Sequence, residues 1–494
     1  MKRLLDIWRA WSLRKRLTIV GALALVTAGG ALAAYFVLKR DGDEGCAPNC
    51  PKLTREKPKK RPPPEVETVN WAEYGYDDAR TRYLPSKLVS PPFKPSEWSW
   101  QAGKLLEFSP IVYDESLYVM DFNAEFYSLD KDTGKVEWTR TLGTKGASSP
   151  SAANGQLFGV TLEPGTAFSL DAESGRRLWS RELPGRSETS PLVHGKKVYV
   201  GSESGEVFAL NRNTGAIKWQ VSTGGPVKGG LAFEDGVVYA GNYAGELYAL
   251  DAGNGDVKWQ NGTQGASFGR TGSIYSTPAV AYGRVFVGSI DGRVYSFEQD
   301  SGALVWSHST GAEVYPAPAV AEVEGAPPTV FVGSADQNFY ALDAEDGSVR
   351  WQQDVGGVVI GAASVVGDTA YVGVIGDNIG TFGFDAKTGK KTFEHEFGEY
   401  NPVISDGEKL YLTGYSGIRA FEPADPKKLR ERRQEEGRLK RRREAKREAR
   451  GASASGANQP KGRGTGASGG AQSGGPGGSE GGEGKPGGGA AKGA

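Results

Sequence analysis

The sequence predicts an all-β protein: an eight-bladed β-propeller of four-stranded antiparallel blades, with one N-terminal transmembrane helix and a disordered C-terminal tail. Three observations support this prediction. A unit of about 40 residues recurs along the middle of the chain, and each copy contains short segments rich in β-branched and aromatic residues. Gly or polar turns separate these segments, and no helical pattern lies between them. The two flanks differ in composition from the repeats.

The N-terminal flank has the composition of a membrane anchor. Residues 1–16 contain 6 Lys and Arg and form a predicted cytoplasmic segment. Residues 17–38 carry no charge, and 22 residues at about 1.5 Å each span the roughly 30 Å hydrocarbon core. We therefore expect a single-pass signal anchor in the plasma membrane, with the propeller extracytoplasmic, at the cell surface or in the periplasm. A cleavable signal peptide ending near Ala33 is the alternative, and it exports the same domain.

A Pro- and Lys-rich segment, residues 39–65, follows the anchor and is predicted to form a semi-extended stalk. It contains Cys46 and Cys50, which are the only cysteines of the chain. Outside the cytoplasm such a pair is a candidate disulfide. The predicted propeller, residues 66–422, contains no cysteine, so its stability must come from packing.

The C-terminal flank is polar throughout. Residues 423–450 form a basic charged segment, and residues 451–494 form a Gly/Ser-rich tail that cannot bury a core and is predicted to be disordered. Two interpretations of the basic end stay open: solvation alone, or electrostatic contact with anionic envelope polymers.

Charge is segregated along the chain, although the whole molecule is neutral. Residues 1–64 carry 14 Lys and Arg against 5 Asp and Glu, and residues 423–494 carry 17 against 8. The segment between them carries 28 against 46, a net charge of −18. An acidic body argues against specific binding of nucleic acid by the folded domain.

Each repeat closes on an aromatic residue, and the blades can be counted from these residues. They are Trp138, Trp179, Trp219, Trp259, Trp306, Trp351 and Phe393, at spacings of 41, 40, 40, 47, 45 and 42 residues. This is the span of one four-stranded blade. We expect each Trp to bury its flat face between neighbouring blades. An acidic or amide residue opens the turn before each of them, and Gly follows four residues later, as in Asp130 and Gly134.

The way the ring closes decides the number of blades. Seven repeats are complete, and an eighth, residues 402–421, lacks its last strand. At the other end, residues 96–104 form a lone strand with Trp100, which lies 38 residues before Trp138. We predict that this strand completes the last blade, which gives eight blades, and that Trp100 has the same docking role as the other tryptophans.

The units resemble the repeat of pyrroloquinoline quinone (PQQ)-type propellers. KVYVGSESGEVFALNRNTGAIKW (197–219) and VVYAGNYAGELYALDAGNGDVKW (237–259) carry the pattern almost throughout, and residues 70–88 resemble the stretch before the first blade of such proteins. The resemblance covers about 350 residues and implies the fold. It implies no single function, because these repeats occur in quinoprotein alcohol dehydrogenases, in the propeller lipoprotein of outer-membrane protein assembly and in extracellular sensor domains.

In the catalytic members, the resemblance implies calcium held by a Glu and an Asn or Asp, an Asp base, a Trp against the quinone, and often a disulfide between adjacent cysteines. No adjacent cysteines are present, and acids such as Asp171 and Asp251 recur at equivalent turns. The three histidines, His194, His308 and His395, lie in different blades without ligand spacing. We expect no catalytic, cofactor-binding or metal-binding residues; a dehydrogenase dependent on PQQ and calcium is the alternative.

The favoured function is a membrane-anchored scaffold that binds other envelope or membrane proteins through propeller loops, without catalysis. Three departures from the repeat are candidate contact loops: residues 261–277, 321–329 and 373–383. The Gly-rich segment 224–230 and the Ser-Pro or Thr-Pro pairs that open several blades are interpreted as structural. An extracellular sensor or ligand-binding domain is a second alternative, although residues 1–16 are too few to signal without a partner in the membrane.

Overall fold

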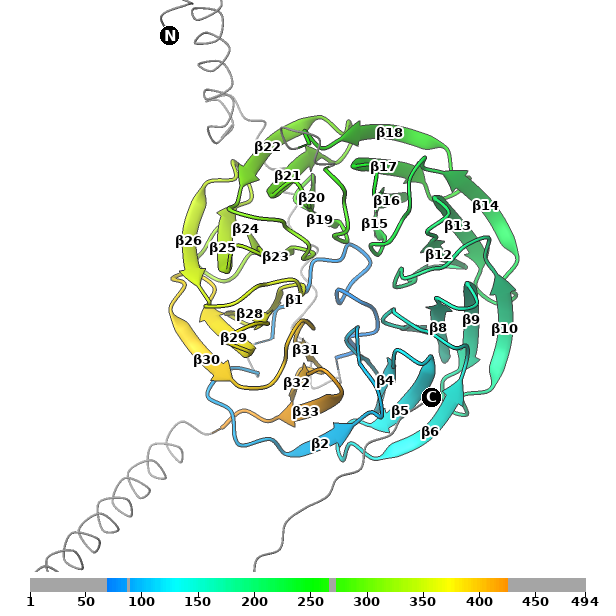
Figure 1. The fold of residues 1–494 in the computed structure, drawn as a ribbon, viewed down its shortest axis with the longest axis horizontal. Coiled ribbons are helices and arrows are strands. Elements are labelled where there is room, and N and C mark those ends of the chain that lie inside the picture. The colour runs from blue at the N-terminus through cyan, green and yellow to red at the C-terminus, as the bar shows by residue number, and fades with distance from the viewer. Residues whose placement is uncertain (1–68, 87–88, 266–271, 425–494) are drawn as a thin grey trace, which may run out of the picture. The chain divides into compact units, whose positions relative to one another are not determined.

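A computed structural model describes residues 69–86, 89–265 and 272–424, and these residues form a closed ring of eight sheets (Figure 1). Each sheet has four antiparallel strands, and one of them gains a fifth, parallel strand. The sheets follow one another around the ring in chain order, and the described residues contain strands and no helix. The predicted eight-bladed propeller is thereby confirmed. The predicted anchor (17–38), the flanking segments, Cys46, Cys50 and the tail lie outside the described residues. Within the described residues, no helix is long and apolar enough to cross a membrane.

Blades are numbered in chain order, and each is given from its inner to its outer strand. Blade 1 is β3 (Ile111–Tyr113), β4 (Ser116–Met120), β5 (Glu125–Asp130) and β6 (Val136–Thr141). Blade 2 is β7 (Ser151–Ala153), β8 (Gln156–Thr161), β9 (Thr166–Asp171) and β10 (Arg177–Glu182). Blade 3 is β11 (Leu192–His194), β12 (Lys197–Gly201), β13 (Glu206–Asn211) and β14 (Ile217–Ser222). Blade 4 is β15 (Ala232–Glu234), β16 (Val237–Gly241), β17 (Glu246–Asp251) and β18 (Val257–Gly262).

The remaining blades repeat this order. Blade 5 is β19 (Ala279–Ala281), β20 (Arg284–Ser289), β21 (Arg293–Glu298) and β22 (Leu304–Ser309). Blade 6 is β23 (Ala319–Ala321), β24 (Thr329–Gly333), β25 (Asn338–Asp343) and β26 (Val349–Asp354). Blade 7 is β27 (Ser364–Val366), β28 (Thr369–Val374), β29 (Gly380–Asp385) and β30 (Lys391–His395), joined on its inner side by β1 (Tyr83–Leu84). Blade 8 is β31 (Ile404–Ser405), β32 (Leu410–Thr413), β33 (Gly417–Phe421) and β2 (Trp98–Gln101).

The turn between the third and outer strands shows how the repeated residues shape a blade. In blade 1, the carboxylate of Asp130 accepts hydrogen bonds from the amide (2.7 Å) and hydroxyl (2.6 Å) of Thr133. Gly134 then adopts a φ of 67°, which Gly reaches without steric cost. The third strand before this turn is buried on both faces against the neighbouring blades, as in β5 and β13, whereas the outer strand after it is largely exposed, as in β6 and β14.

Pairing of β2 with β33 closes the ring, with Trp98 opposite Ala420 and Trp100 opposite Ile418. The predicted closure is therefore confirmed. Strands from the two ends of the propeller share one sheet, which packs against blade 1, so neither the first nor the last blade has an uncovered sheet face.

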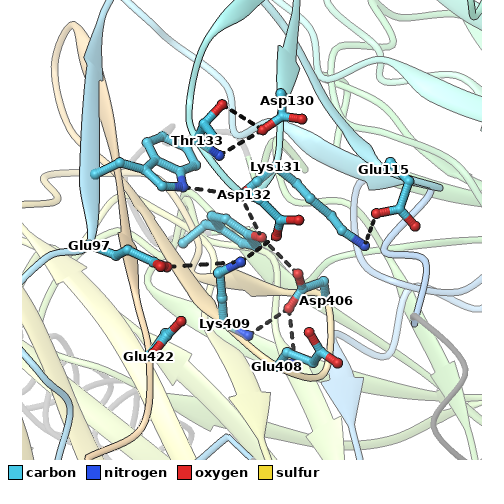
Figure 2. A network of polar contacts seen from close by, with 12 residues as sticks. Glu97, Glu115, Asp130, Lys131, Asp132, Thr133, Asp406, Glu408, Lys409 and Glu422 are labelled. Atoms are coloured by element: carbon cyan, nitrogen blue, oxygen red, sulfur yellow. Dashed lines mark hydrogen bonds and ion pairs between the residues drawn. The ribbon is translucent and has the colours of Figure 1, made fainter.

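A polar network reinforces the junction between blades 8 and 1 (Figure 2). The ammonium group of Lys409, just before β32, bonds Asp132 of blade 1 and lies 3.9 Å from the carboxylate of Glu97, just before β2. Lys131 is also buried, and its ammonium group lies 3.0 Å from the carboxylate of Glu115. Both lysines are buried with an acidic partner, as the cost of removing a charge from water requires.

Residues 69–86, called the central segment below, run through the middle of the ring (Figure 1). The amide of Val69 donates to the carbonyl of Asp406 in blade 8. The central segment then accepts one amide hydrogen bond from the inner strand of each of blades 1 to 7 in turn, donated by Val112, Ala152, Val193, Phe233, Val280, Val320 and Val365. It therefore satisfies inner-strand amides that would otherwise face the channel.

The two faces of the ring are built from different connections. Tight turns that join the first to the second strand, and the third to the outer strand, form one face, which we call the turn face. Loops between the second and third strands, and from each outer strand to the next blade, form the opposite face, which we call the loop face. Val69, bonded beside the turn that follows β31, and Ala424, bonded to Pro92 after the end of β33, both lie on the turn face.

Candidate functional site

A cavity of about 760 Å³ opens on the loop face at the centre of the ring. Its walls come from loops that lead from the outer strand of one blade to the inner strand of the next, and its floor includes Tyr74 of the central segment. This is the size of a small-molecule site.

One position of the repeat contributes a lining residue from seven of the eight blades. It is the fourth residue before the inner strand, and in blades 1 to 8 it is occupied by Glu107, Ala147, Glu188, Lys228, Tyr275, Tyr315, Ile360 and Tyr400. All of these except Ala147 line the cavity. The residue type at this position differs between the repeats, although the strands that follow it are alike. The fold therefore does not require one residue type there, and the position can be used for ligand binding.

The wall has two chemically different halves. Blades 1, 3 and 4 contribute the charged residues of the series, Glu107, Glu188 and Lys228. The ammonium group of Lys228 lies 2.9 Å from the carboxylates of both Glu188 and Glu203, and 5.5 Å from the ring centroid of Tyr243. Glu107 stands apart, since no hydrogen bond or ion pair reaches its carboxylate within the part of the chain that the structure describes. Burial raises the pKa of Glu107, while the charge of Lys228 acts to lower it.

The other half is aromatic and apolar. Blades 5, 6 and 8 present Tyr275, Tyr315 and Tyr400. Tyr275 packs edge-on against Tyr243, with ring centroids 6.1 Å apart, and against Tyr315 at 6.5 Å. Burial raises the pKa of Tyr275 and Tyr400, so both phenols are neutral at physiological pH. The hydroxyl of Tyr400 is buried and has no hydrogen-bond partner among the described residues.

The central segment holds the floor in place through two buried arginines. Arg80 forms an ion pair with Glu73 at 2.7 Å and donates to the carbonyls of Leu231 (2.8 Å) and Pro191 (2.9 Å). The guanidinium of Arg82 lies 4.9 Å from the ring centroid of Tyr74, which reaches the cavity. These contacts fix the floor relative to blades 3 and 4.

The cavity residues do not fit PQQ and calcium. PQQ carries three carboxylates, but the cavity offers one cation, Lys228, which two carboxylates already neutralise. The described lining contains no Trp that could stack on the quinone, and no Cys. Across the described residues, no group of three His, Cys, Asp or Glu side chains is arranged to hold a metal ion.

The tryptophans lie between blades, away from this cavity. The indole nitrogens of Trp138, Trp179, Trp219, Trp259, Trp306 and Trp351 each donate to a carbonyl in the third-to-outer turn of the next blade. At the closing blade, this contact is made by Trp98, which donates to the carbonyl of Lys131 at 3.1 Å. Trp100, for which the docking role was expected, also contacts blade 1, because its ring packs against Tyr127 on β5 with centroids 4.9 Å apart, but it does not make this hydrogen bond to the turn.

The histidines are not brought together. His194, on β11, hydrogen-bonds Asp78 of the central segment and stacks on Phe233. His308 lies on β22 and His395 on β30, in different blades.

Of the candidate contact loops, residues 261–277 are described only in part and contribute Tyr275 to the cavity, whereas residues 321–329 form a turn on the turn face. Residues 373–383 include a loop on the loop face.

A family model described as outer membrane protein assembly factor BamB matches residues 96–229, 207–325 and 318–465. The chain belongs to this family of PQQ-like repeat propellers. Among curated relatives, a BamB of Legionella pneumophila is 30% identical over 105 residues, 21% of this chain and 27% of that protein. The 1-butanol dehydrogenase (cytochrome c) of Thauera butanivorans is 28% identical over 154 residues, 27% of this chain and 22% of that protein. These alignments span about a quarter of each relative's length.

Solved structures from both groups share the fold. The quinohemoprotein alcohol dehydrogenase ADHIIG of Pseudomonas putida superposes with a TM-score of 0.63 at 14% identity, over 72% of this chain and 80% of that one. BamB of Moraxella catarrhalis superposes with a TM-score of 0.55 at 18% identity, over 67% of this chain and 100% of that one. At these identities the likeness concerns the fold alone.

Proposed function

We propose that this chain is a non-catalytic binding module, which holds other envelope proteins against the loop face of its propeller. The observation that carries the proposal is a set of three exposed apolar side chains on that face, which we call the apolar rim; two of them, Ile360 and Tyr415, also line the cavity. Ile360, Ile379 and Tyr415 are 37%, 50% and 59% exposed and lie on the loops of blades 7 and 8. Exposed apolar side chains gathered on neighbouring loops are typical of protein-binding surfaces.

The other exposed apolar residues have a different explanation. Val136, Ile217, Val257, Leu304 and Val349 occupy the beginning of an outer strand in five different blades. Their recurrence ties them to the repeat, whereas Ile360, Ile379 and Tyr415 are particular to blades 7 and 8. Both ends of the described chain lie on the turn face, opposite these three residues.

Family membership supports the scaffold over a dehydrogenase, because the matching family model is named for a protein assembly factor. The mismatch between the cavity residues and PQQ supports the same choice.

We further propose that residues 17–38 anchor the chain in the plasma membrane and hold the propeller outside the cytoplasm. Contact of the basic C-terminal segment with anionic envelope polymers is part of the same proposal.

A site-specific photo-cross-linking experiment on the full chain in its native cells tests the function. With a photoreactive residue in place of Ile379, on the loop face, we expect a discrete cross-linked product that contains another envelope protein. The same residue in place of Ile217 is the matched control, because Ile217 is 44% exposed but begins an outer strand beside the turn face. Cross-links of equal yield from both positions, or from neither, would contradict the proposed binding face.

A further inference from the structure

The cavity on the loop face has its own chemistry, which a scaffold that binds proteins does not require. Its wall is divided between a charged half, blades 1 to 4, and an aromatic half, blades 5 to 8. A ligand that satisfies both halves must combine a charge with apolar surface.

The sign of that charge follows from the ion pairs. Lys228 is shared between Glu188 and Glu203 at 2.9 Å from each, so it carries no free positive charge for an anionic ligand. Glu107 lies on the same wall, is partly buried, and has no bonded partner among the described residues. Three carboxylates against one ammonium group make this half negative, and it attracts cations.

The aromatic half complements an organic cation. Rings of Tyr attract positive charge through their electron-rich faces and bury the apolar body of a ligand. Tyr243, Tyr275 and Tyr315 form one chain of ring contacts, and Tyr400 and Tyr415 also line the cavity. The volume of about 760 Å³ accommodates a small organic molecule, which a bare metal ion would not fill.

We propose that this cavity binds an organic cation with an apolar body, whose charge lies against Glu107 and whose apolar part packs on Tyr275, Tyr315 and Tyr400. The inference goes beyond the proposed scaffold function and does not depend on it. Loss of cation binding would leave the cross-linking experiment unaffected, and the reverse also holds.

Two water-soluble probes of matched shape test the proposal by isothermal titration calorimetry on the full chain in non-ionic detergent. Benzyltrimethylammonium and benzylsulfonate share a benzyl group and carry a compact head group of opposite charge. We expect saturable binding of the ammonium probe and none of the sulfonate. Equal binding of the two probes, or binding of neither, would overturn the proposal.

A pair of isosteric variants then locates the charge. Glu107→Gln removes the unpaired carboxylate and keeps its shape, so we expect the ammonium probe to bind about fivefold more weakly or worse. Glu173→Gln is the control, because Glu173 is exposed in a turn on the turn face. Thermal unfolding of each variant verifies the fold. Unchanged affinity in Glu107→Gln would refute the assigned site.

Discussion

The contact between Trp98 and Gly134 shows at the scale of single residues how the ring is held shut. A Cβ added to Gly134 would lie 2.4 Å from Cε3 of Trp98, so the indole takes the space that a side chain would need. The same Trp–Gly contact recurs between other neighbouring blades, for example between Trp179 and Gly215. Gly is therefore required at this turn for two reasons: its backbone has a positive φ, and the indole ring of Trp98 occupies the space of a side chain.

We expect Gly134→Ala to lower the free energy of unfolding by about 2–4 kcal/mol, measured by urea denaturation. Gly195→Ala is a matched control, because Gly195 has a similar φ of 58° but no atom within 4 Å of an added Cβ. It should cost only the backbone strain, about 1 kcal/mol. Equal losses in the two variants would mean that the indole contact contributes nothing.

The repeat spacing in the sequence identifies Trp98, but the docking role was assigned to Trp100, two residues further along. Trp98 lies 40 residues before Trp138, which matches the spacing of the first repeats better than the 38 residues from Trp100. Both residues lie on one strand, two positions apart, and therefore point to the same side of the sheet, so the alternation of side chains along the strand does not distinguish them. The turn residues of the next blade decide which ring docks.

At the scale of elements, the blades were predictable and the central segment was not. Strands and turns follow from local patterns of apolar residues, acids and Gly. The central segment, in contrast, is held by inner-strand amides that come from about 40 to 280 residues further along the chain. Its resemblance to the stretch before the first blade suggested a place in the fold, but nothing local indicated that it visits every blade.

The ion pair of Arg80 and Glu73 anchors the central segment, and its loss should be costly. We expect Arg80→Met to lower the free energy of unfolding by about 3–5 kcal/mol, because Glu73 would stay buried without a cation. Burial raises the pKa of Glu73 to about 8 even with Arg80 beside it, so without Arg80 this carboxyl must take up a proton to stay buried. Adding Glu73→Gln to Arg80→Met should recover part of the loss, because Gln is neutral and needs no proton. Both effects are measured by urea denaturation.

An exposed ion pair provides the comparison. Lys145 and Glu163 lie 3.1 Å apart, and both side chains are 43% exposed. Lys145→Met should therefore change the free energy of unfolding by less than about 1 kcal/mol. If Arg80→Met proved equally mild, the central segment would not be an integral part of the ring.

The cavity marks the limit of what the sequence could reveal about the site. The Gly-rich loop 224–230 and the blade-opening Ser-Pro pairs were interpreted as structural, yet Lys228 lies within this loop, and Glu107 and Glu188 each lie two residues before such a pair; all three line the cavity. The sequence feature that could have revealed the cavity is the position four residues before each inner strand, because its residue type changes from repeat to repeat between charged, small, aliphatic and aromatic. This variation indicates a binding site only once the structure shows that the eight equivalent positions lie around the central axis of the ring.

At the scale of the whole molecule, closure makes a rigid ring with two unlike faces. The turn face carries both ends of the described chain, and the loop face carries the cavity and its apolar rim. The same fold is shared by alcohol dehydrogenases and by BamB, so the choice between chemistry and binding rests on the cavity residues.

Titration of the full chain with PQQ and calcium tests that choice most directly, with binding followed by calorimetry and turnover followed by dye-linked oxidation of a primary alcohol. We expect neither saturable binding nor alcohol-dependent dye reduction, because the one cation of the cavity is already neutralised by Glu188 and Glu203. Tight binding of PQQ accompanied by turnover would contradict the binding-module function and make this propeller a quinoprotein dehydrogenase.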